Sequence, residues 1–287
     1  MLFLKKNLKL KISGIVVFLC GIFHLYLSSS LQAENLPLWE LGIGIGVFTM
    51  PDYNGSDHQQ YYGFPIPYVV YRGELFKVDR ENIRGLFFKS DHVELDVTIN
   101  GKPPVNSNKK NTREGMPDID PTLEFGIQGN VFLLKTERKK ISFKFPLREV
   151  ISIDGYEIAH RGFLFNPVIN CDFNERILNQ YWQLNMFCGP MFSTKTYHRY
   201  FYGVDTKYAT PERPEYDASC GYSGTVLGIS LSRRFERFWI GAFVRAQDLH
   251  STCFRDSPLF KQKTAIMAGV GISWICTQSD NYVVTPY

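Results

Sequence analysis

The feature that most constrains this chain is a strict alternation of large apolar residues with small or polar ones. It starts in residues 39–47, whose sequence is WELGIGIGV. The odd-numbered positions are Trp, Leu, Ile, Ile and Val, and the even-numbered positions are Glu40 followed by glycines. A period of two predicts a β-strand with one apolar face. Because the opposite face carries glycine and a carboxylate, the segment is typical of a barrel strand whose apolar face meets lipid and whose polar face lines a narrow lumen.

The same alternation recurs along most of the chain. It is clear in residues 92–99, 123–133, 141–148, 163–173, 181–188, 237–247 and 266–274, and weaker in residues 64–72, 83–89, 197–202 and 222–231. About twelve strands are therefore expected, within a range of roughly 10 to 14. Strands of about 10 residues, when tilted, span the hydrocarbon core of a bilayer. The predicted fold class is all-β, an antiparallel transmembrane β-barrel.

A soluble β-sandwich or lipocalin-like barrel shows the same alternation with its apolar face turned inward. Three features favour the membrane barrel: aromatic residues near the strand ends, glycine on the polar faces, and polar faces that carry charges of both signs. Enclosed charges are expected to pair, because an unpaired buried charge is costly. The charged residues predicted to line the lumen are Glu94, Asp96, Glu124, Lys144, Arg148, Asp172, Arg237 and Arg245.

Residues 1–33 have the composition of a cleaved secretory signal peptide. Lysines precede an apolar run over residues 12–27, and small residues lead to Ala33. The run is shorter than the roughly 20 residues of a membrane-spanning helix. The expected organisation is a signal peptide at 1–33, a barrel at 34–277 and a C-terminal tail at 278–287.

The formal charge of +4 comes from this leader. Without its four lysines the 32 basic residues fall to 28, which equals the 28 acidic ones, so no nucleic-acid partner is expected. Five of the six cysteines remain after cleavage, widely spaced and without a C-x-x-C pair. They are compatible with one or two disulfides in an oxidising compartment or with small packing residues.

Long polar segments at residues 105–118, 205–217 and 254–263 are predicted to be surface loops, whereas Asp154 and Gly155 form a short turn. Long loops at one end and tight turns at the other are typical of outer-membrane barrels. Another predicted loop contains PDYNGSD, and residues 54–57 favour an Asx-type turn there. The surface-loop motif consists of Pro51, Asp52, Tyr53, Gly55 and Ser56.

The sequence predicts no catalytic, cofactor or metal site. The glycines of residues 42–46 lie in a strand and are not followed by a helix, so they do not form a nucleotide loop. No His and Cys spacing typical of a metal site occurs. Ser56, Asp57 and His58 have the residue types of a catalytic triad, but neighbours on one loop rarely hold its geometry. A lipid hydrolase or acyltransferase that uses Ser56 or Ser223 with His58 is the weakest hypothesis.

Several motifs follow one another in order over nearly the whole chain after the leader. They are PDYNGSD (51–57), PIPYVVYRG (65–73), REGMPDIDPTLEFG (113–126), YFYGV (200–204), YDASCGYSG (216–224), SPL (257–259) and GVGISW (269–274). In these motifs the chain resembles the MipA/OmpV family of outer-membrane proteins. One departure is Cys276, which stands where the last strand of such a barrel usually ends on an aromatic residue. Two alternatives are open: Tyr287 serves as this aromatic residue, or the tail extends into the periplasm.

The resemblance implies a β-barrel in the outer membrane of a Gram-negative bacterium, in contact with lipid and lipopolysaccharide. It also implies a non-enzymatic scaffold that joins a lytic transglycosylase to a bifunctional murein synthase. Other members are described as outer-membrane or adhesion-related proteins. The charged, glycine-lined inner faces support a different hypothesis, a channel or solute-binding barrel.

Overall fold

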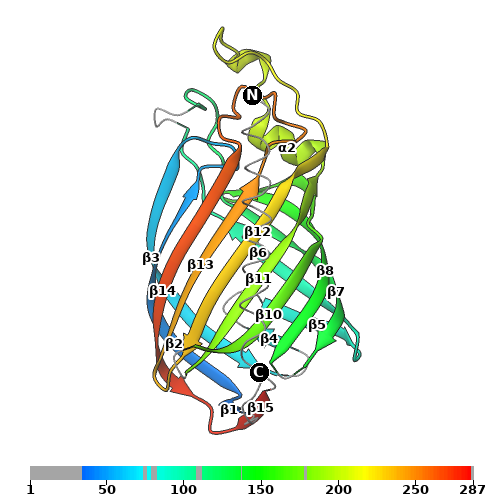
Figure 1. Cartoon of the computed structure of the whole chain (residues 1–287). Helices are drawn as coiled ribbons and strands as arrows, with labels where there is room; N and C mark the ends of the chain where they lie inside the picture. Colours follow the sequence, from blue (N-terminus) through cyan, green and yellow to red (C-terminus); the bar gives the residue numbers. More distant parts are fainter. Residues whose placement is uncertain are drawn as a thin grey trace, which may run out of the picture. The chain divides into compact units, whose positions relative to one another are not determined.

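The structure is a computed structural model that describes residues 34–73, 76–78, 83–107, 112–136, 138–177 and 180–285 (Figure 1). The predicted signal peptide and Tyr287 lie outside the described residues. The chain divides into two compact units, Met1–Glu34 and Asn35–Tyr287. The second unit contains the sheet and all of the sites discussed below.

The second unit is built mostly from strands. In chain order they are β1 (Glu34–Pro37), β2 (Trp39–Pro51), β3 (Gln59–Arg72), β4 (Phe76–Val78), β5 (Ile83–Lys89), β6 (Val93–Lys102), β7 (Thr122–Lys135), β8 (Lys139–Asp154), β9 (Glu157–Phe165), β10 (Val168–Ile177), β11 (Gln180–Ser193), β12 (Gly221–Arg234), β13 (Phe238–Asp248), β14 (Thr264–Gln278) and β15 (Tyr282–Thr285). The helical elements are α2 (Lys195–Tyr202) and the 3-10 turn η1 (Thr206–Tyr208). Within the described residues, neither is long and apolar enough to cross a membrane.

The described strands form one 13-stranded sheet and a two-stranded sheet of β1 and β15. The large sheet has the order β10-β11-β12-β13-β14-β2-β3-β4-β5-β6-β7-β8-β9, and its pairings are antiparallel. Two further pairings, β10 with β8 and β11 with β9, connect the two ends of this order. Neighbouring strands are thus mostly consecutive in the chain, which is the order of an up-and-down β-barrel.

β9 and β10 together follow a single path between β8 and β11. The register pairs Leu147 of β8 with Phe165 of β9, and Lys144 of β8 with Val168 of β10. The interruption falls at Asn166 and Pro167, because proline has no backbone N–H to donate to the ladder. The Asn166 side chain instead donates to the Pro190 carbonyl at 2.8 Å.

The strands turn their apolar faces outward, as the alternation predicts. Ile43 is 61% exposed and Ile45 69%, whereas Glu40 on the other face of β2 is fully buried. The same holds on β14, where Ile272 is exposed and Ser273 is buried. Glycine at position 44 is required by the close approach of β14, since an added Cβ would lie 2.2 Å from the Ile272 carbonyl oxygen. The prediction that the polar face is the enclosed one is confirmed.

The main apolar core lies at the loop end of the sheet. We define the cap as the described residues 52–58, 103–107, 112–121, 194–220 and 249–263, which lie between strands on the same side as α2 in Figure 1. Buried apolar residues of the cap pack together and against the ends of the strands. At the other end, the described connections are short and β1 pairs with β15. This matches the asymmetry of long loops and tight turns predicted from the sequence.

One predicted strand is wrong. Residues 197–202 belong to the helix α2, whose buried residues are Tyr197, His198, Phe201 and Tyr202. These recur at a spacing of three and four, which places them on one face of a helix. The aromatic side chains are also typical of strands, so the short segment fits both periods.

Candidate functional site

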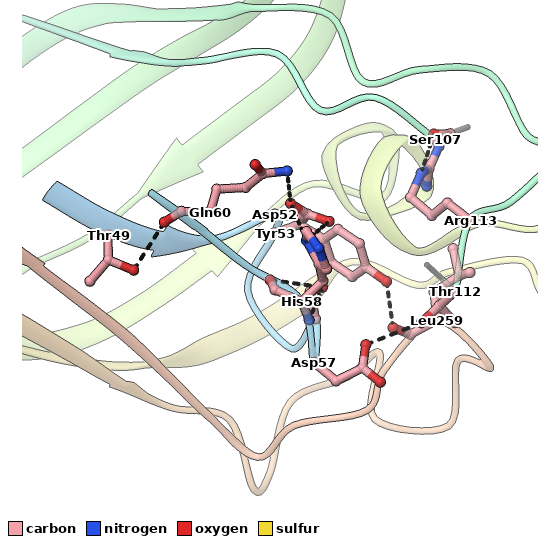
Figure 2. Close-up of polar contacts among 11 residues, drawn as sticks. Thr49, Asp52, Tyr53, Asp57, His58, Gln60, Ser107, Thr112, Arg113 and Leu259 are labelled. Carbon is pink, nitrogen blue, oxygen red and sulfur yellow. Dashed lines mark hydrogen bonds and ion pairs between the residues drawn. The ribbon is translucent and has the colours of Figure 1, made fainter. Parts of the chain in front are cut away.

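The PDYNGSD loop is held by hydrogen bonds within itself (Figure 2). The Asp52 N–H donates to the His58 carbonyl at 3.1 Å, and the Ser56 N–H donates to the Tyr53 carbonyl at 2.9 Å. The Ser56 hydroxyl accepts from the His58 N–H at 3.1 Å. The Asp52 carboxylate lies 3.2 Å from Nδ1 of His58 and accepts from Gln60 at 2.8 Å. Polar side chains of this motif therefore stabilise a turn.

Gly55 has a backbone conformation that its position requires. Its φ is +95°, in the region that favours glycine, and an added Cβ would lie 2.5 Å from the ring of Phe260. The Gly55 carbonyl accepts from the N–H groups of Lys261 and Gln262 at 2.7 and 2.9 Å. The loop after β2 is thereby joined to the loop between β13 and β14.

Tyr53 anchors the same loop in the core of the cap. Its hydroxyl donates to the Leu259 carbonyl at 2.8 Å, and its ring packs edge-on against Tyr202. Burial raises the pKa of Tyr53 to about 12. Pro51, at the end of β2, is also buried. All five residues of the motif are buried in the structure, so the prediction that they form an exposed surface is wrong; they hold the cap together instead.

Arg113 joins two further segments of the cap. Its guanidinium donates to the carbonyls of Phe201 and Pro117, each at 3.1 Å, and to the Ser107 hydroxyl at 3.5 Å. The side chain is buried, and this burial lowers the pKa of Arg113. The loop between β6 and β7 is therefore tied to the end of α2.

No triad forms from Ser56, Asp57 and His58. The His58 ring faces Asp52, and the Ser56 hydroxyl bonds only to backbone atoms of His58 in the described contacts. Ser223 also does not meet His58: its hydroxyl lies 2.7 Å from Nε2 of His198. The serine pairings proposed for a lipid hydrolase are therefore wrong.

His198 is the centre of a buried polar group under the cap. Its Nδ1 lies 2.7 Å from the Ser219 carbonyl, which only accepts, so Nδ1 carries a proton and donates. Nε2 then accepts from Ser223, whose Oγ lies 2.8 Å from that of Ser193. Burial lowers the pKa of His198, which keeps the ring neutral. Ser223 is 1% exposed, so this pair lacks the substrate access that a nucleophile needs.

The surface of the cap contains a cavity of about 610 Å³ formed by four loops. Its lining carries charges of both signs and two hydroxyls. The lining residues are Asp57, His58, Thr112, Glu114, Thr210, Glu212, Arg213 and Lys261. Among the residues that the structure describes, no group of three or more His, Cys, Asp and Glu side chains is placed to hold a metal ion.

Beneath α2, the inner faces of four strands bring charged residues together. Glu124 of β7 lies 3.3 Å from Nζ of Lys102 and 3.3 Å from Nε of Arg148. Arg245, on β13, interacts electrostatically with both Glu124 and Arg148. Glu124, Arg148 and Arg245 were predicted from the sequence to line the lumen. Lys102 was not, although it lies on the same face of β6 as Glu94 and Asp96.

The other predicted lumen residues lie in separate surroundings. Glu94 pairs with Lys135 at 3.4 Å, and Asp96 accepts from Asn130 at 3.0 Å. Asp172 accepts from Asn170 and Asn185, and Lys144 is half-buried opposite Asn130 in the register. Arg237 is an exposed residue of the turn before β13, so its assignment to the lumen is wrong.

A second ionic group lies near the end of the sheet opposite α2. The buried Glu40 carboxylate accepts from Arg72 at 2.8 Å and from Tyr68 at 3.1 Å, and it also pairs with Arg234. These residues come from β2, β3 and β12. Glu40 was predicted to lie on the polar face of its strand, but its partners could not be predicted because they are distant in the chain.

The cysteines Cys171, Cys188, Cys220, Cys253 and Cys276 are free thiols in this structure. Cys253 is the one nearest to the buried polar group, with its Sγ 3.3 Å from Nδ1 of His198. Burial raises the pKa of Cys253, which disfavours the reactive thiolate.

The sequence matches the protein family described as MltA-interacting protein MipA over residues 43–276, which confirms the resemblance drawn from the motifs. None of the curated proteins matches the chain. Among solved structures, the chain is similar to a bacterial polysaccharide outer membrane secretin, with a TM-score of 0.40 and 9% identity over 83% of this chain and 99% of that one. It is also similar to the Pseudomonas putida toluene transporter TodX (TM-score 0.27, 6% identity, 82% and 88% covered) and to OprG from Pseudomonas aeruginosa (TM-score 0.22, 8% identity, 86% and 96% covered).

Proposed function

Because this chain belongs to the MltA-interacting protein MipA family, which it matches over residues 43–276, we propose that it is an outer-membrane β-barrel that anchors a periplasmic protein. The proposed partners are those that the resemblance implies, a lytic transglycosylase and a bifunctional murein synthase of a Gram-negative bacterium. In this role the chain is a scaffold rather than an enzyme, and it contacts lipid and lipopolysaccharide around its sheet.

The exposed apolar face of the sheet is the observation that carries the membrane assignment. Residues such as Ile43, Ile45 and Val270 are more than half exposed, while Glu40 and Ser273 on the opposite face are buried. In water this arrangement would expose a continuous apolar surface, which soluble proteins avoid. In a bilayer the same surface meets lipid, and the polar faces are enclosed.

A scaffold role is supported by the polar and apolar groups that occupy both ends of the sheet. The cap packs a buried core at one end, and the Glu40 group links β2, β3 and β12 at the other. In outer-membrane barrels the short turns face the periplasm. We therefore infer that the periplasmic partner docks at the end that holds the β1–β15 sheet.

Site-specific photocrosslinking tests this proposal. A photoreactive phenylalanine analogue at Tyr282, which lies in β15 and is 56% exposed, is expected to capture a purified lytic transglycosylase of the MltA type. The same substitution at Tyr156, a fully exposed residue of the β8–β9 turn near the cap, is the matched control. Capture from position 156 instead of 282, or from neither in a folded barrel, would overturn the docking proposal. If the protein does not show heat-modifiable migration in a gel, the assignment as a β-barrel is refuted.

A further inference from the structure

Three cations and a single carboxylate gather beneath α2, and their role goes beyond anchoring a partner. We define the basic cluster as Lys102, Glu124, Arg148 and Arg245. These residues come from β6, β7, β8 and β13, and their side chains extend from the inner face of the sheet. Glu124 is buried, and among the described residues it is the only carboxylate that forms an ion pair with any of the three cations.

Two of the cations are held in place by the carboxylate and by neutral partners. Lys102 Nζ lies 3.3 Å from Glu124 and donates to the Tyr197 hydroxyl at 2.8 Å. Arg148 Nε lies 3.3 Å from Glu124, and Nη1 donates to Asn100 at 2.8 Å when the amide is oriented to satisfy both of its atoms. The buried Nε–H of Arg148 makes no hydrogen bond of good geometry in the described chain. Both cations are thus held in place, and each keeps N–H groups that can donate further hydrogen bonds.

The third cation, Arg245, has no such partner. Within the described residues its guanidinium makes neither a hydrogen bond nor an ion pair, and Glu124 and Arg148 are among the charged groups within electrostatic range of it. Three positive charges therefore share one carboxylate. Because like charges in an enclosed site repel, an excess of positive charge there is costly unless an anion joins them.

Two of the three cations are partly exposed. The Lys102 side chain is 35% exposed although the rings of Tyr197 and Phe201 lie over its ammonium, at 5.5 and 5.4 Å from the ring centroids. Arg245 is also only half-buried. Both side chains lie on the enclosed face of the sheet, so their exposed parts face the lumen.

We propose that the basic cluster binds a small dianionic oxyanion of the phosphate or sulfate type within the lumen. Two positive charges of the cluster remain after Glu124 is counted, which matches the charge of such an anion. Planar guanidinium groups present paired N–H donors that fit tetrahedral oxyanions, and Lys102 adds a point charge. Glu124 positions Lys102 and Arg148 for the anion, and its negative charge opposes anion binding.

The test uses the full-length barrel in zwitterionic detergent micelles and isothermal titration with sodium phosphate against a sodium chloride background. Saturable phosphate binding is expected, sulfate is expected to compete, and chloride at equal ionic strength is not. Arg245→Gln is expected to weaken phosphate binding by about tenfold or more, because one charge-assisted donor group is removed. Arg237→Gln makes the same change at the exposed turn and is expected to bind as the wild type does.

Heat-modifiable migration verifies that each variant is folded, and Arg245 is suited to the test because its side chain bonds to no described residue. Glu124→Gln adds a second readout: it removes the competing negative charge, so a folded variant is expected to bind phosphate more tightly. Absence of phosphate binding by the wild-type protein, equal binding by Arg245→Gln, or equal competition by chloride would each overturn the proposal. These results leave the crosslinking from position 282 unaffected, so the two proposals fail separately.

Discussion

His198 on α2 and Ser223 on β12 lie 2.7 Å apart, Nε2 to Oγ, and both side chains are buried. His198→Leu would leave Ser223 and the Ser219 carbonyl without this partner, and a buried polar group left unsatisfied costs about 1–3 kcal/mol. We expect α2 to be released more often, as measured by faster hydrogen exchange of its amides. His160→Leu changes an exposed histidine and should leave this exchange unaltered.

The stability of the cap is expected to fall in mildly acidic solution. Burial lowers the pKa of His198 in the folded cap, whereas the released helix has an ordinary histidine pKa of about 6.5. The released state therefore takes up a proton first, so the stabilisation is complete above about pH 6.5 and is lost as the pH falls below that value. Hydrogen exchange of α2, corrected for the intrinsic effect of pH, measures this. A His198→Gln variant with the same pH dependence would contradict the assignment.

Ile43→Arg should prevent or weaken insertion of the barrel. Ile43 is 61% exposed on the apolar face of β2, and arginine on the lipid face of a barrel costs about 2–4 kcal/mol near the middle of the bilayer. Glu94→Gln is on the inner face and should be tolerated better. The folded fraction of each variant, from gel migration with and without heating, gives the comparison. Equal losses would mean that the two faces are assigned incorrectly.

Glu40→Gln should destabilise the sheet more than Glu94→Gln does. Glu40 is fully buried and compensates both Arg72 and Arg234, whereas Lys135, the partner of Glu94, has 36% of its side chain exposed. Loss of one member of a buried ion pair costs about 3–5 kcal/mol, and less here because the two arginines retain some exposure. Urea midpoints in micelles measure the difference, and identical midpoints would refute it.

Tyr53→Phe should loosen the PDYNGSD loop without unfolding the sheet. It removes the buried hydrogen bond to the Leu259 carbonyl, which contributes about 0.5–1.5 kcal/mol. Limited proteolysis of residues 249–263 should accelerate accordingly. Tyr61→Phe, at a tyrosine that is 82% exposed, is the matched control and should not change the cleavage rate.

The facing of the strands was predictable because it is a local property. Side chains of a strand alternate between two faces, so Ile43 and Ile45 share one face and Glu40 lies on the other. The alternation by itself does not say which face is enclosed. The glycines and the carboxylate of β2 predicted correctly that the polar face is enclosed. Residues 197–202 were misassigned because four aromatic or apolar positions in a short segment fit the helical period as well as that of a strand.

The candidate sites, in contrast, depend on residues that are distant in sequence. Glu124 and Arg148 were predicted to line the lumen, but their meeting with Lys102 follows from the register of β6, β7 and β8. In the same way His198 meets Ser223 only because α2 folds back over the start of β12.

The sequence by itself determined that this chain forms antiparallel strands with an apolar outer face and long loops at one end, since periodicity and turn chemistry act between neighbouring residues. Only the tertiary structure decided that Arg245 shares its surroundings with Glu124 and that Glu40 pairs with Arg234. The physical reason is that contacts across the lumen depend on the curvature of the sheet and the stagger of its strands, and no short segment encodes either of these alone.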